Sequence, residues 1–111
     1  AEQVEIIRQI HDLLTSNLDQ RCSIETLSRQ YLMNPTTLKR MFKAIYGTSI
    51  AAHIREHRME HAAQLLRSSD LSIADIALKV GYDSQSRFSS VFKEYYQMLP
   101  KEYRRRCSDG V

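Results

Sequence analysis

The chain has 111 residues, of which 42% are hydrophobic and 26% are charged, as expected for one small globular domain. Only three glycines and two prolines occur, which leaves little turn material for a many-stranded sheet and favours an all-α fold. No apolar run approaches the roughly 18 residues that a membrane span requires, so we expect no membrane contact. Cys22 and Cys107 form neither a disulfide framework nor a metal-ligand spacing, which favours a reducing compartment.

The positive charge is unevenly distributed along the chain. The net charge is +3, but residues 1–30 carry three basic and five acidic side chains. Residues 35–58 carry five basic and one acidic, and residues 83–106 carry six basic and three acidic. Two basic segments on a mildly acidic framework indicate an anionic partner, and we expect nucleic acid.

The first half of the chain predicts three helices. An apolar stripe at helical spacing predicts a helix over residues 2–18. Ser23 is a candidate N-cap for a short second helix. Asn34, followed by a proline, predicts the start of a third helix that runs to about Tyr46 and ends at Gly47, a residue suited to a left-handed C-cap.

The second half predicts four more helices and no strand. A long fourth helix covers residues 49–68, and Ser72 caps a short fifth. Asp83 or Ser84 caps a sixth helix, and Pro100 opens a seventh. The expected fold is therefore all-α, with seven helices.

Two segments of the chain, 23–47 and 72–97, follow one plan. The shift between matched residues is 49 at the start of each segment and 50 toward its end. The matched pairs are Ser23 and Ser72, Ile24 and Ile73, Leu27 and Ile76, Asn34 and Asp83, Leu38 and Phe88, Phe42 and Phe92, Lys43 and Lys93, and Tyr46 and Tyr96. Each segment predicts a short helix, a tight turn and a longer helix, which is the helix-turn-helix arrangement that places its second helix in the DNA major groove.

The second helix of each segment begins with polar residues, whereas apolar residues hold the rest of it in place. Arginine can form two hydrogen bonds to guanine, glutamine can bridge adenine, and serine or threonine suits a base or a phosphate. The candidate reading residues are Thr36, Thr37, Lys39, Arg40 and Lys43 in the first segment and Gln85, Ser86, Arg87 and Ser90 in the second. A polar helix start is often only a solvated cap, but two in register within a repeat favour DNA.

The helix between the segments has a suitable length for a spacer. Nineteen helical residues span roughly 28 Å at 1.5 Å per residue, and major-groove faces of B-DNA recur about every 34 Å. We therefore expect two reading helices that enter adjacent major-groove segments of one duplex.

Residues 81–103, GYDSQSRFSSVFKEYYQMLPKEY, resemble the signature of the AraC/XylS family of bacterial transcription regulators. LKRMFKAIYGTS and IREHRMEHAAQLL, farther upstream, are similar to that family's first unit and connecting helix. The resemblance implies two helix-turn-helix subdomains joined by a long central helix, binding promoter DNA alone or within a dimer. It also implies transcriptional activation through RNA polymerase, and an N-terminal effector or dimerisation domain that we expect to lie outside this sequence.

Carried over by position, the family's base or backbone contacts fall on the residues named above and on Ser84. Two positions depart from the family pattern. Gln97 stands where a glycine is usual, which predicts a strained or reshaped helix end, and His53 replaces a usual aromatic residue. Neither lies on the expected reading faces.

Several other patterns allow two interpretations. His53, His57 and His61 recur every four residues and could hold a metal, but no further ligand completes the set, so we expect no metal. Lys93, Arg104, Arg105 and Arg106 either bind phosphate or complement a helix dipole, and we assign Lys93 to DNA. The tyrosines are expected in the core rather than stacked on bases. A redox role for the two cysteines is not expected.

The sequence does not predict an enzyme or a cofactor. It has no glycine-rich phosphate loop, no nucleophile elbow and no paired carboxylates in a plausible cleft. We predict sequence-specific binding of double-stranded DNA by a bacterial cytoplasmic, nucleoid-associated regulator. The alternatives are a helical module that binds an acidic protein through the same faces, and a small-molecule sensor, which would need an apolar cavity.

Overall fold

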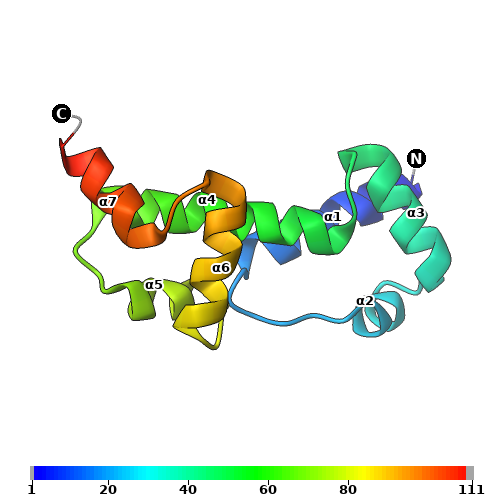
Figure 1. Ribbon diagram of the computed structural model, residues 1–111. Coiled ribbons are helices and arrows are strands. Elements are labelled where there is room, and N and C mark those ends of the chain that lie inside the picture. The colour runs from blue at the N-terminus through cyan, green and yellow to red at the C-terminus, as the bar shows by residue number, and fades with distance from the viewer. Residues whose placement is uncertain (1, 110–111) are drawn as a thin grey trace. The chain divides into compact units, whose positions relative to one another are not determined.

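The computed structural model describes residues 2–109, and this part of the chain contains seven α-helices and no β-strand. This confirms the predicted all-α, seven-helix fold. The helices are α1 (Glu2–Ser16), α2 (Ile24–Gln30), α3 (Pro35–Tyr46), α4 (Ile50–Ser68), α5 (Ile73–Lys79), α6 (Gln85–Tyr96) and α7 (Pro100–Asp109), shown in chain order in Figure 1. Across the described residues, no helix combines the length and apolar character needed to cross a bilayer.

The chain forms two compact units, which we call unit 1 (Ala1–Glu56) and unit 2 (His57–Val111). The boundary falls inside α4, which continues without interruption for 19 residues. Each unit contains a short helix followed by a longer one, α2–α3 in unit 1 and α5–α6 in unit 2, so the repeat in the sequence corresponds to a repeat of helix pairs.

The core of unit 1 holds α3 by its apolar side. Leu38 and Phe42 of α3 are fully buried and pack with residues of α1, with Leu27 of α2 and with Ile50 at the start of α4. The α1 residues are Ile7, Ile10 and Leu14. Burial of each large apolar side chain contributes about 1.5–3 kcal/mol, so this core fixes which side of α3 remains outside.

Unit 2 repeats this arrangement with a more aromatic core. Phe88 and Phe92 of α6 are fully buried, and Tyr96 and Tyr103 pack at the edge of the same cluster. Their buried partners are Met59, Ala62, Ala63 and Leu66 of α4, Ile76 and Ala77 of α5, and Val80 and Tyr82 of the turn. The small alanines of α4 and α5 leave room for the bulky rings of α6.

Polar side chains start the helices, largely as the sequence predicted. Ser23 and Ser72 Oγ accept from the backbone N–H of Thr26 and Asp75, at 3.1 Å and 3.0 Å. The cap of α6 is Ser84 and not Asp83, since Ser84 Oγ accepts from Arg87 N–H at 3.0 Å. These local bonds satisfy N–H groups that have no partner within the helix.

Candidate nucleic-acid interface

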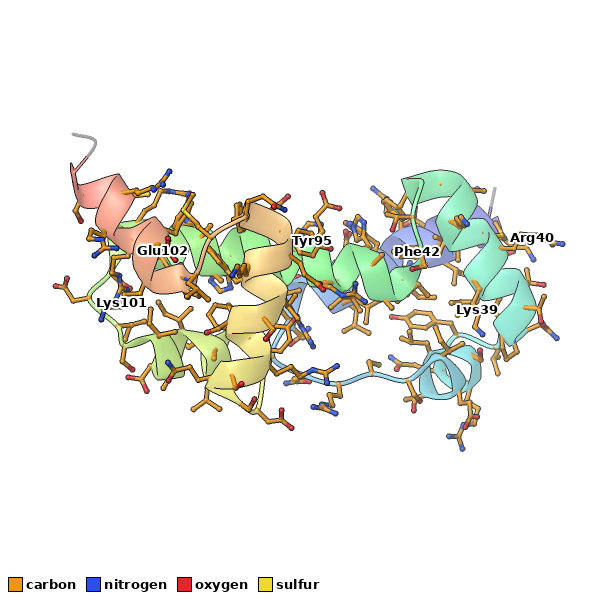
Figure 2. The ribbon with its side chains drawn as sticks, viewed as in Figure 1. Lys39, Arg40, Phe42, Tyr95, Lys101 and Glu102 are labelled. Atoms are coloured by element: carbon orange, nitrogen blue, oxygen red, sulfur yellow. The ribbon has the colours of Figure 1, made fainter. Side chains whose placement is uncertain are left out.

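In unit 1, the reading candidates lie on the outer side of α3. Asn34 caps the helix by accepting from the N–H groups of the next two threonines, and Pro35 occupies its first position. Thr36, Lys39, Arg40 and Lys43 are exposed and Thr37 is half-buried. Figure 2 shows Lys39 and Arg40 extending away from the unit, with Phe42 directed toward its core.

The three cations of α3 are available to an external anion. Within residues 2–109, the side chains of Lys39, Arg40 and Lys43 make no hydrogen bond or ion pair. Their positions, 39, 40 and 43, put them within about one turn of each other on the helix surface. A polyanion that approaches α3 therefore meets three uncompensated charges.

In unit 2, the corresponding surface of α6 is less charged and richer in hydroxyl groups. Gln85, Ser86, Arg87, Ser90 and Lys93 are all exposed, as is the cap Ser84. Two of the hydroxyls already take part in the helix, because Ser84 accepts from Arg87 N–H and Ser90 donates to the Ser86 carbonyl at 3.1 Å. Ser90 can therefore only accept a further hydrogen bond while this contact lasts.

The turns between the paired helices share one backbone hydrogen bond. In each turn, a left-handed residue follows the first helix, Leu32 with φ 51° in unit 1 and Gly81 with φ 101° in unit 2. The next residue then donates back to the last turn of the helix, Met33 to Ser28 at 3.0 Å and Tyr82 to Ala77 at 2.8 Å. This is the Schellman arrangement, which turns the chain sharply toward the reading helix.

Unit 2 has one residue more in this turn. Three residues separate the end of α2 at Gln30 from the cap Asn34, whereas four separate the end of α5 at Lys79 from the cap Ser84. This explains why the repeat shift grows from 49 to 50 along the sequence. It also corrects the match of Asn34 with Asp83, since Asn34 corresponds in function to Ser84.

The far ends of the two reading helices also match. Gly47 ends α3 with φ 79° and Gln97 ends α6 with φ 61°, each donating its N–H to a lysine carbonyl four residues earlier at 2.8 Å. Gln97 therefore keeps the cap geometry that glycine adopts, and its side-chain amide donates to the Glu94 carbonyl at 3.0 Å. The predicted reshaping does not occur, and the strain remains at one backbone position.

An aromatic trio anchors each reading helix to its unit. In unit 2, the Phe92 ring lies 4.6 Å from that of Tyr96 and 5.4 Å, at 76°, from that of Tyr103. In unit 1, the Phe42 ring lies 4.8 Å from that of Tyr46 and 5.4 Å, at 78°, from that of His53. His53 therefore occupies the position that Tyr103 has in unit 2 (shift 50).

The basic end of the chain divides into residues with different surroundings. Arg104 donates to the carbonyl oxygens of Leu66 at 3.2 Å and Ser69 at 3.1 Å, and so closes the C-terminal end of α4. Arg67 donates to the Tyr103 hydroxyl at 2.6 Å, and this bond raises the pKa of Arg67. Arg105 and Arg106 remain exposed. Arg104 thus has a structural partner that the sequence did not reveal.

The comparison with known proteins assigns the family. A family model described as "Helix-turn-helix domain" matches residues 27–106, a stretch that begins within α2 and includes all of α3, α4, α5 and α6. The chain belongs to the AraC/XylS-type helix-turn-helix family.

Relatives of this family cover most of the chain. The right origin-binding protein of Escherichia coli (strain K12) is 36% identical over 104 residues, covering 94% of this chain and 36% of that protein. The HTH-type transcriptional activator AarP of Providencia stuartii is 34% identical over 102 residues, covering 92% of this chain and 76% of that protein. The chain thus spans about a third of the length of the first of these two relatives.

A solved structure confirms that the helices are those of this family. The C-terminal domain of AraT, a response regulator from Geobacillus stearothermophilus, is 36% identical with a TM-score of 0.85, covering 90% of this chain and 84% of that one. The AraC/XylS resemblance predicted from residues 81–103 is therefore confirmed in both sequence and fold.

Proposed function

We propose that this chain binds double-stranded promoter DNA sequence-specifically and serves as the DNA-binding domain of a bacterial transcription activator. The observation that carries the proposal is the presence of two matched helix pairs, each with a longer helix held by its apolar side while polar and basic residues stay outside. The family supports it, since its relatives include a transcriptional activator and an origin-binding protein by name. In the proposed complex, α3 and α6 read adjacent major-groove segments.

The residues divide into base readers and backbone contacts. Arg40 and Arg87 are proposed to read guanine through two hydrogen bonds, and Gln85 to read adenine. The remaining candidates fix the register on phosphates: Thr36, Thr37, Lys39, Lys43, Ser84, Ser86, Ser90 and Lys93. The arginines, lysines and Gln85 are all exposed, as either kind of contact requires.

The full-length regulator is proposed to have further partners. RNA polymerase is the proposed target for activation, and the protein is proposed to bind promoter DNA either alone or within a dimer. Both proposals rest on the family, whose resemblance also implies an effector or dimerisation domain. The place of action is the nucleoid, in the cytoplasm.

Selection of bound duplexes from a random pool tests the proposal. We expect a preferred site with two unlike halves about one helical turn apart, because α3 and α6 present different side chains. Binding to the selected site should weaken steeply with salt. Absence of salt-dependent binding to any duplex would contradict the proposal and would favour a module that binds an acidic protein.

A further inference from the structure

Two histidines of unit 1 lie close together, beside the aromatic trio that anchors α3. The rings of His11, in α1, and His53, in α4, have centroids 4.8 Å apart at 57°. Coordinating nitrogens of the two rings lie within 4.8 Å of each other. Both side chains are half-buried, and His11 also stacks on Tyr46 at 4.2 Å.

Packing alone does not require an imidazole at position 53. In unit 2 the matching position holds Tyr103, whose ring makes the same edge contact with phenylalanine, at 5.4 Å and 76° against 5.4 Å and 78° for His53. A tyrosine therefore satisfies this geometry. Unit 1 differs by having a metal-ligating ring there and a second one, His11, next to it.

The surroundings of His11 are those of a metal-bound histidine. Its Nδ1 lies 3.1 Å from Asp12 Oδ1. A carboxylate beside one ring nitrogen is the arrangement that orients metal-bound imidazoles in proteins. The His11 side chain is 20% exposed and that of Asp12 68%, so solvent and ions can reach the site.

The spacing also suits a transition metal. Tetrahedral Zn–N bonds of about 2.0–2.1 Å place two ligand nitrogens roughly 3.4 Å apart. Since the nitrogens of the two rings lie within 4.8 Å, the rings must approach by at most about 1.4 Å to share one ion.

We propose that His11 and His53 bind a divalent transition-metal ion, with Zn²⁺ as the best match for neutral imidazole ligands. The ion links α1 to the first half of α4, and it braces the aromatic trio from which α3 extends. Metal binding thus stabilises unit 1 and holds its reading helix in place. This site goes beyond the proposed DNA binding and does not depend on it.

Titration of the tag-free protein with Zn²⁺ tests the site without any DNA. We expect one Zn²⁺ to bind, and Tm to rise by roughly 10 °C when free Zn²⁺ is about 100 times Kd. Co²⁺ should give visible d–d absorption that saturates at one equivalent and disappears on addition of Zn²⁺. Isothermal titration calorimetry supplies the stoichiometry and Kd.

Matched variants separate coordination from packing. His53→Tyr copies the matching residue of unit 2 and His11→Phe keeps a ring against Tyr46, so both should retain the helical circular dichroism of the parent. Each should weaken Zn²⁺ binding at least tenfold, whereas His61→Ala, in the same helix, should leave Kd unchanged. Equal Zn²⁺ binding by the parent and His53→Tyr, or no binding by the parent up to about 1 mM Zn²⁺, would overturn the proposal and leave the DNA-binding function untouched.

Discussion

The two helix-turn-helix units have left-handed residues at the same two places, in the turn and at the end of the longer helix, but glycine occupies a different one of them in each unit. Unit 1 has Leu32 in the left-handed position of its turn and Gly47 at the end of its reading helix, whereas unit 2 has Gly81 in the turn and Gln97 at the end. The backbone bonds donated by Met33 and Gly47 in unit 1 nevertheless have counterparts donated by Tyr82 and Gln97 in unit 2. The shared core and these bonds therefore determine the conformation, and each unit tolerates one strained residue.

The units differ more in the charges of their reading helices. At shift 50, Arg40 corresponds to Ser90 and Arg87 to Thr37, so the two arginines stand at different positions along their helices. Lys43 and Lys93 are the one matched pair of cations. A common scaffold thus presents two unlike surfaces, which is what an asymmetric binding site requires.

The largest expected effect comes from removing the anchor of either reading helix. Phe42→Ala and Phe92→Ala each delete a fully buried ring from an aromatic trio, so each should lower the free energy of unfolding by about 3–5 kcal/mol. Urea denaturation measures this loss. Ile45→Ala, in α3 but 42% exposed, is the matched control and should cost far less. If only one phenylalanine proved costly, the two units would not share one anchoring scheme.

Loss of a base-reading arginine should have the next largest effect, on DNA binding rather than on stability. Arg40→Ala or Arg87→Ala is expected to weaken binding to the selected site by about 1–3 kcal/mol and to relax selectivity in one half of it. The affected half should differ between the two variants, because the arginines belong to different units. Gel shifts over a set of point-changed sites measure this, and equal losses on every sequence would mean that the arginine contacts only phosphate.

Lys43 and Lys93 provide the matched test of phosphate contacts. Replacement of either lysine by alanine should weaken binding to all sequences about equally and should reduce the slope of log K against log salt by about 0.9. Fluorescence titrations at several salt concentrations give the slope. A difference between the two variants would show that α3 and α6 approach the DNA backbone unequally.

The local features of this fold could be predicted from the sequence, because their causes are local. Asn34 and Ser84 start helices through bonds to N–H groups two or three residues away, and Gly47 ends one through its own backbone freedom. The apolar spacing of α3 and α6 likewise identified the outer side, on which ten of the eleven candidate reading residues are exposed and Thr37 is half-buried. Whether they contact DNA remains a prediction.

The features that were missed depend on contacts between distant residues. His11 was not expected beside His53, since only the packing of α1 against the start of α4 brings them together. Arg104 was predicted either to bind phosphate or to complement a helix dipole. Its hydrogen bonds to the Leu66 and Ser69 carbonyls were missed, because they connect residues 38 and 35 apart in sequence. Leu32 could have been found from the repeat, because a shift of 49 aligns it with Gly81.

Gly47→Ala tests the strain at the end of α3. The added methyl group would meet no atom within 4 Å, so the φ of 79° is the sole source of the expected destabilisation. A loss of about 1–2 kcal/mol in the free energy of unfolding is expected. Gln97→Ala is the comparison, since it changes neither handedness nor strain and removes only the hydrogen bond to Glu94. Equal losses in both variants would show that left-handed strain is not the main cost.

The smallest expected effects are gains in stability from copying each unit's glycine into the other. Leu32→Gly should raise the free energy of unfolding by about 0.5–1 kcal/mol, because relief of the left-handed strain exceeds the added entropy of the unfolded chain. Leu32 is 93% exposed, so little packing is lost. Gln97→Gly should gain less, since it also loses the bond to the Glu94 carbonyl. Urea denaturation ranks the two variants, and a loss of stability in Leu32→Gly would mean that this exposed leucine makes a stabilising contact that outweighs its backbone strain.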